Sequence, residues 1–134
     1  MVAKQKLSAE EKTAILGRID TASTLDAVAN CDLVIEAVFE DIDVKRAVFA
    51  QLGQHCRADA ILATNTSYLD PRAIAQGLTH PERFLGLHFF SPANVMKLLE
   101  VVRGSKTSDG TMASVMKMGR DIGKVSVGCG NCDG

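Results

Sequence analysis

Residues 84–102, FLGLHFFSPANVMKLLEVV, contain two β-rich runs joined by a connection of only seven residues. A parallel crossover needs a dozen or more residues, so the runs 84–89 and 97–102 are predicted to pair antiparallel. His88 and Glu100 are each six residues from the midpoint of the connection. If the connection is symmetric, these two side chains face each other directly across the ladder.

The rest of the chain alternates buried, β-branched runs with helical patterns. Expected strands are 32–38, 60–64, 84–89, 97–102 and 124–127; expected helices begin at a Ser8–Glu11 capping box and span 25–29, 42–56, 71–77 and 108–122. Residues 18–23 are expected to be extended. Buried strands that alternate with helices predict an α/β fold, a mostly parallel sheet with helices on both faces and one antiparallel pair towards the C-terminal part.

Composition excludes several classes of protein. The chain has 134 residues, about one domain, with a formal net charge of −1 and a pI near 6.3. Without an excess of Lys and Arg, it is expected to bind neither nucleic acid nor a membrane surface. No apolar run approaches the roughly 20 residues that span a bilayer, and residues 1–7 are not expected to be a signal peptide because no apolar run follows their charges. The four cysteines are therefore expected to be reduced in a cytoplasmic protein.

Cys129 and Cys132 have CxxC spacing, which can indicate a zinc or redox site. There is no second CxxC and no nearby histidine. No metal site is therefore predicted.

Polar residues follow three of the expected strands, at the carboxyl ends where open α/β sheets bind ligands. These are Glu40 after the first, Asn65 and Ser67 after the second, and His88 at the end of the third. Histidine titrates near neutral pH and can serve as a base or an acid, and a facing carboxylate such as Glu100 would fix its tautomer. The alternative is a hydrogen-bonded core histidine without a chemical role.

Four ordered motifs, DLVIEAVFED (32–41), ILATNTSYL (61–69), RFLGLHFFSP (83–92) and VMKLLEVV (95–102), closely resemble the L-3-hydroxyacyl-CoA dehydrogenases. The likeness includes 3-hydroxybutyryl-CoA dehydrogenases and the dehydrogenase parts of multifunctional β-oxidation enzymes, and it covers essentially the whole chain. It implies a partial Rossmann-like NAD-binding domain over residues 1–134. The implied reaction is the NAD-dependent oxidation of a 3-hydroxyacyl-CoA to a 3-ketoacyl-CoA in fatty-acid or related metabolism.

The resemblance also assigns roles. His88 matches the catalytic base, Glu100 the carboxylate that orients it, and Ser67 the serine that hydrogen-bonds the substrate oxygen. Positions beside NAD are matched by Val38, Glu40, Lys45, Asn65, Ser67 and Ser91. Ser91 stands where the family usually has Asn, and Tyr68 where Ser is usual.

Three of these residues also have a purely structural explanation. Lys45 falls outside the apolar stripe of its amphipathic helix and could simply be solvated. Glu40 could be a carboxylate at a helix start, and Asn65 a turn former.

The sequence has no GxGxxG turn, whose amides bind the pyrophosphate in such domains. From the resemblance we therefore expect that the first strands, which carry that turn in the family, and the family's C-terminal helical domain are absent. With the strand order 3-2-1-4-5-6, residues 18–23 would be the third strand, and the edge of the strand at 33–38 would be open to pairing or homo-oligomer formation. Besides an impaired dehydrogenase, two other hypotheses remain open. One is a non-catalytic remnant or interaction module, and the other is an oxidoreductase whose phosphate loop comes from a partner chain.

Overall fold

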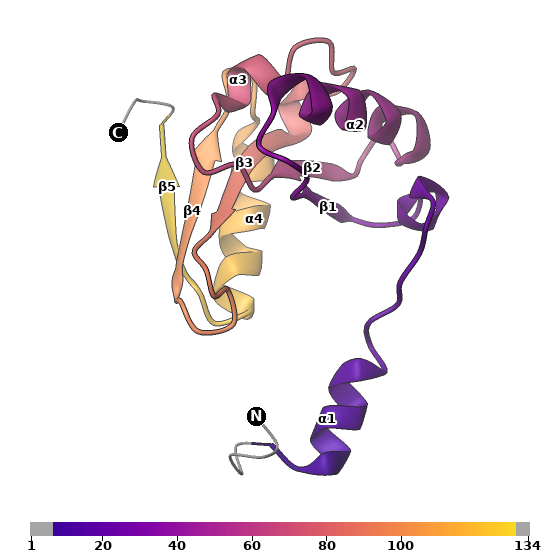
Figure 1. Ribbon diagram of the computed structural model, residues 1–134. Helices are drawn as coiled ribbons and strands as arrows, with labels where there is room; N and C mark the ends of the chain where they lie inside the picture. The colour runs from indigo at the N-terminus through magenta and orange to yellow at the C-terminus, as the bar shows by residue number, and fades with distance from the viewer. Residues whose placement is uncertain (1–6, 131–134) are drawn as a thin grey trace.

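The computed structural model describes residues 7–130 and shows a five-stranded sheet with helices on both faces (Figure 1). The strands are β1 (Leu33–Glu36), β2 (Ile61–Thr64), β3 (Phe84–Phe89), β4 (Leu98–Arg103) and β5 (Val125–Cys129), and they lie in this order across the sheet. β3 and β4 pair antiparallel, whereas the other three pairs of neighbours are parallel. The predicted mostly parallel sheet is confirmed.

The β3–β4 pair has the register that its short connection predicts. His88 lies opposite Glu100 in the ladder. The connection itself is held from the neighbouring strand, because Lys124, just before β5, donates to the carbonyl oxygen of Ala93 and, at 2.6 Å, to that of Met96. His88 and Glu100 therefore lie next to a connection that Lys124 holds in place.

Helices cover the two faces of the sheet as predicted. The helical segments are α1 (Ala9–Leu16), η2 (Leu25–Val28), α2 (Ile42–His55), α3 (Pro71–Ile74), η3 (Pro81–Arg83) and α4 (Asp109–Asp121). α2 and α3 pack on one face, where Phe49, Ile74 and Phe84 are buried together. α4 packs on the other, where Val115 meets Leu85. No helix within residues 7–130 is long and apolar enough to cross a membrane.

Alternation along β3 decides which face carries the polar residues. Leu85 and Leu87 point to the α4 side, where they are fully buried. Phe84 belongs to the cluster under α2 and α3, and His88 shares its face because side chains alternate along a strand. The polar end of β3 therefore opens towards the α2 and α3 side.

Residues 18–23 form no strand, so the expected third strand of a doubly wound sheet is wrong. The segment has one large apolar side chain, Ile19, which is 61% exposed, and it therefore has no apolar face to bury in a sheet. It links η2 to α1, which lies away from the sheet with no buried residue (Figure 1). The capping box of α1 is confirmed: the Glu11 amide donates to Ser8 Oγ and the Ser8 amide to Glu11 Oε2.

β1 is shorter than the predicted run 32–38. Its ladder ends at Glu36 because the Val38 amide turns back to donate to Glu36 Oε1 at 2.7 Å. On its other side β1 has no strand partner among residues 7–130. Pairing of a second copy along this edge stays a prediction.

Replacing Gly86 with Ala is expected to destabilise the sheet. An added Cβ would lie 2.9 Å from Cβ of Val102, its partner on β4, and neither strand can yield easily at that point. We expect urea denaturation to show a loss of about 1–3 kcal/mol. The control is Gly53→Ala in α2, where an added methyl has open space and should stabilise by about 0.5–1 kcal/mol. Equal effects would contradict the close approach of β3 and β4.

Candidate active site

Polar side chains gather at one edge of the sheet, where the parallel strands β1, β2 and β3 end. The Ser67 amide, after β2, donates to Glu40 Oε1 at 3.0 Å, after β1. The Ser67 hydroxyl oxygen lies 3.4 Å from Nε2 of His88 at the end of β3. The structure thus brings together the three polar segments that the sequence singled out, although they are more than 20 residues apart in the chain.

His88 and Glu100 form the central pair of this cluster. Nδ1 of His88 is 2.9 Å from Oε2 of Glu100. A carboxylate only accepts hydrogen bonds, so the network assigns the proton of the neutral ring to Nδ1 and leaves a lone pair on Nε2. That lone pair faces the Ser67 hydroxyl. The arrangement is a base held in one tautomer beside a hydroxyl group.

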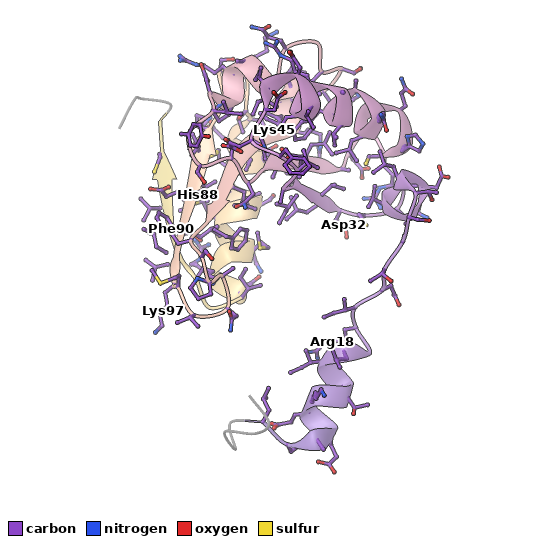
Figure 2. All side chains as sticks on the ribbon, viewed as in Figure 1. Arg18, Asp32, Lys45, His88, Phe90 and Lys97 are labelled. Carbon is purple, nitrogen blue, oxygen red and sulfur yellow. The ribbon has the colours of Figure 1, made fainter. Side chains whose placement is uncertain are left out.

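Phe90 packs on the His88 ring, with ring centroids 4.5 Å apart and ring planes at 47° (both residues are labelled in Figure 2). Such a contact restricts rotation of the imidazole and shields one of its faces from water. Sequence reasoning missed Phe90, because it is the first residue of the connection after β3 and its apolar side chain carries no chemical signal.

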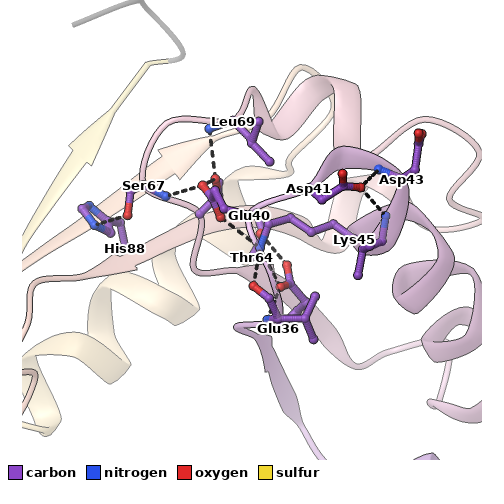
Figure 3. A network of polar contacts seen from close by, with 12 residues as sticks. Glu36, Glu40, Asp41, Asp43, Lys45, Thr64, Ser67, Leu69 and His88 are labelled. Carbon is purple, nitrogen blue, oxygen red and sulfur yellow. Dashed lines mark hydrogen bonds and ion pairs between the residues drawn. The ribbon is translucent and has the colours of Figure 1, made fainter.

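The Glu40 carboxylate contacts the segment after β2 and helix α2 (Figure 3). Its Oε1 accepts the Ser67 amide and the Thr66 hydroxyl, and its Oε2 lies 3.3 Å from Lys45 Nζ. Burial on its own would raise the pKa of the Glu40 carboxyl. The bonds from Thr66 and Ser67, and then the Lys45 ammonium, outweigh burial and hold that pKa below its ordinary value.

Lys45 is not solvated, so that alternative is wrong. Its side chain is 1% exposed, and Nζ lies 2.7 Å from Glu36 Oε1 and 3.3 Å from the Val38 carbonyl oxygen. Asp41 caps the start of α2 by accepting the Asp43 and Val44 amides, which sets the helix so that Lys45 points inward (Figure 3). The helical pattern placed Lys45 off the apolar stripe because a buried ion pair has no apolar signature.

The remaining predicted residues surround this cluster. Asn65 accepts the Phe89 amide at 2.8 Å through Oδ1, and its Nδ2 has no partner among the described residues. Val38 is 39% exposed at the end of β1. Ser91 is exposed on the β3–β4 connection, and no hydrogen bond joins it to the other polar groups within residues 7–130. Of the CxxC cysteines, Cys132 lies outside the described residues.

Sequence reasoning assigned no individual role to Glu36, Thr64 and Thr66. All three are buried polar residues. Glu36 did leave a signal: it is the single charged residue inside the apolar run 33–38, and a carboxylate there must find buried donors. Thr64 gave none, since Thr suits a strand for steric reasons alone, and Thr66 lies in the loop after β2, where a small polar residue is ordinary.

Comparison with known proteins agrees with this fold. The family described as 3-hydroxyacyl-CoA dehydrogenase, NAD binding domain matches residues 1–132. A probable 3-hydroxyacyl-CoA dehydrogenase of Caenorhabditis elegans is 48% identical over 98% of this chain, and the peroxisomal bifunctional enzyme of Cavia porcellus 49% identical over 84%. The crystal structure of 3-hydroxybutyryl-CoA dehydrogenase from Escherichia coli superposes with a TM-score of 0.93 at 42% identity and covers 97% of the chain.

The chain has the fold of an NAD-dependent oxidoreductase domain. It belongs to the 3-hydroxyacyl-CoA dehydrogenase family, in the NAD-binding domain, and NAD is the cofactor that this family's description names. The chain spans 46% of the nematode relative, 16% of the Cavia enzyme and 28% of the E. coli structure. The recognition, fold class and cofactor predicted from the motifs are confirmed.

Replacing Lys45 with Met is expected to destabilise the chain strongly, by about 3–5 kcal/mol, because it leaves the Glu36 carboxylate buried without its cation. The double variant Glu36→Gln/Lys45→Met removes both charges and should recover most of this loss. Lys117→Met is the control, since its exposed pair with Asp121 is worth about 0.5 kcal/mol or less. Urea denaturation measures all three, and a double variant no more stable than Lys45→Met would contradict the buried pair.

The lowered pKa of Glu40 predicts a pH dependence of stability. The folded state holds the carboxylate more strongly than the unfolded state does, so this stabilisation is complete above the ordinary pKa of 4.5 and is lost as the pH falls through the lower folded value. The stability difference between the native chain and Glu40→Gln should therefore shrink below about pH 4.5. Glu82→Gln, at an exposed carboxylate, is the control. A constant difference between pH 7 and pH 3 would count against this assignment.

Proposed function

We propose that this chain carries the acid–base site of an enzyme that oxidises L-3-hydroxyacyl-CoA to 3-ketoacyl-CoA with NAD. The observation that carries the proposal is the His88 ring, held through Nδ1 by Glu100 at 2.9 Å while Nε2 faces the Ser67 hydroxyl at 3.4 Å. A secondary alcohol gives up a proton and a hydride when it is oxidised to a ketone. The site offers a base for the proton and a neutral donor for the oxygen.

Each residue of the site has a separate task. His88 accepts the proton of the substrate hydroxyl at Nε2, and Glu100 stabilises the imidazolium that forms. Ser67 donates its hydroxyl to the substrate oxygen and holds it within reach of the ring. Phe90 keeps water from one face of the imidazole. In the reverse direction His88 returns the proton to the carbonyl oxygen.

The residues around the site suit NAD. Val38 is half-exposed and Phe39 84% exposed, which gives apolar surface for a flat ring, and the polar groups of Glu40, Asn65 and Ser67 lie beside it. NAD, when bound, supplies the hydride acceptor. Glu40 and Asn65 would take its hydroxyl and amide groups.

Lys45 and Ser91 fit the predicted cofactor contacts less directly. Lys45 is enclosed by carboxylates, so it would support the cofactor surface from beneath. Ser91 is exposed on the β3–β4 connection, and its contact with NAD stays a prediction.

The names of the relatives support a proposal for the substrate class and for the cellular setting. Their names describe 3-hydroxyacyl-CoA and 3-hydroxybutyryl-CoA dehydrogenases, and we propose an acyl-CoA substrate in fatty-acid metabolism. For the compartment we propose the cytoplasm, supported by the thiols of Cys31 and Cys56, which form no disulfide among the described residues. The peroxisome is the alternative, because several relatives are peroxisomal bifunctional enzymes.

A second candidate is a non-catalytic interaction module of the same fold. It is favoured by the unpaired edge of β1 in the described part of the chain. In that case the site residues would be inherited and unused. A third, an oxidoreductase completed by a partner chain with the phosphate loop, makes the same site active only in a complex.

Turnover of acetoacetyl-CoA with NADH tests the proposal, followed as loss of NADH absorbance. His88→Ala should lower the rate by about 10²–10⁴-fold because the proton donor is lost. His80→Ala is the matched control, since His80 is exposed and pairs with Glu82 away from the site. Binding of NADH, followed by its fluorescence, should survive both substitutions.

Absence of both turnover and NADH binding in the unmodified chain would contradict the proposal and favour the interaction module. Activity that appears only after addition of a protein carrying a GxGxxG turn would favour the partner-chain reading. Equal rates for His88→Ala and the unmodified chain would remove His88 from the mechanism.

A further inference from the structure

A buried carboxylate lies at the β1 end of the polar cluster, where the proposed reaction does not use it. The Glu36 side chain is 0% exposed. Its Oε1 accepts from Lys45 Nζ and the Val38 amide, each at 2.7 Å, and its Oε2 accepts the Thr64 hydroxyl at 2.7 Å. Three donors from β2, α2 and the loop after β1 therefore meet on one acid.

From Glu36 a continuous line of polar contacts leads to the base (Figure 3). Lys45 Nζ contacts the Glu36 carboxylate and also lies 3.3 Å from Glu40 Oε2. Glu40 Oε1 in turn accepts the Ser67 amide at 3.0 Å. The Ser67 hydroxyl then meets His88 Nε2. The contacts connect the end of β1 with the end of β3, past the loop that follows β2.

The position of Ser67 depends on this line. Ser67 is exposed, and its described contacts are one to Glu40 through its amide and one to His88 through its hydroxyl. Glu40 sits in the loop between β1 and α2, where Lys45 anchors it from beneath. A lysine side chain is long and flexible and prefers water, so its ammonium stays inside because Glu36 holds it there.

We propose that Glu36 is a positioning residue, which acts through Lys45 and Glu40 to hold the Ser67 hydroxyl against the His88 ring. This inference rests on the proposed function for its catalytic meaning. Its structural content does not depend on that function: the environment of Nε2 on His88 changes when a carboxylate four contacts away is altered.

The test is the ring nitrogen spectrum of His88 in the ¹⁵N-labelled chain without cofactor or substrate. Ser67→Ala gives the position of the Nε2 signal when the hydroxyl is lost. Glu36→Gln should move the signal towards that position. Lys45→Met should move it in the same direction, and the double variant no further than the larger single change, because both residues act on one line of contacts.

Thr107→Val is the matched control. Thr107 is buried and donates to the Phe84 carbonyl, at the opposite end of β3 from His88, so its loss loosens the sheet without touching the cluster. An Nε2 signal that Thr107→Val moves as far as Glu36→Gln does would overturn the proposal. A wild-type signal in a folded Glu36→Gln would overturn it as well.

If Glu36→Gln does not fold, Thr64→Val decides the matter. It is nearly isosteric and removes one of the donors to Glu36, so a smaller shift in the same direction supports the proposal and an unchanged signal overturns it.

In a chain that turns over, Glu36→Gln should lower kcat by roughly 10- to 100-fold, because the Ser67 hydroxyl is no longer held against the ring. A shift of the Nε2 signal in a chain without any turnover supports the positioning line and counts against the proposed function. Turnover in a chain whose Nε2 signal does not shift in Glu36→Gln supports the proposed function and overturns the positioning role of Glu36.

Discussion

The pairing of His88 with Glu100 depends on one constraint, the antiparallel register of β3 and β4. A short connection forces the two strands to run in opposite directions, and its symmetry places the imidazole opposite the carboxylate on the same face of the sheet. A shift of one residue would turn one side chain to the α4 face, among the leucines. Lys124, bound to two carbonyl groups of the connection, helps to hold that register from the side of β5.

Burial of charge is the second organising feature. An ammonium and a carboxylate inside a protein lose hydration that their attraction does not always return, so a Glu36–Lys45 pair is poor evidence for stability in itself. The pair instead sets the position of the loop after β1. It holds this loop from beneath, and the loop places Glu40 beside Ser67. Stability and placement of the site are here properties of the same contacts.

Much of the fold follows from the sequence because its signals are local. Apolar β-branched runs, the capping box at Ser8 and the short β3–β4 connection each report on a few neighbouring residues, and the strands, helices and register follow. Residues 18–23 show where this fails, since an extended conformation says nothing about whether a partner strand is present. For the site, the motifs identified the residues at the strand ends, but the inward direction of Lys45 depends on a carboxylate from another element, which no helical period reveals.

The arrangement separates two kinds of residue by depth. Ser67 lies at the surface of the cluster, where a substrate oxygen can reach it, and the His88 and Glu100 side chains stay partly open at 18% and 35% exposure. Glu36, Lys45 and Thr64 lie beneath and touch solvent little or not at all. Groups that must exchange protons with a substrate need access, whereas groups that fix their geometry work best where water cannot compete for their hydrogen bonds. In this chain that division follows the ends of β1 and β2, where the buried Glu36 and Thr64 come before the more accessible Glu40 and Ser67.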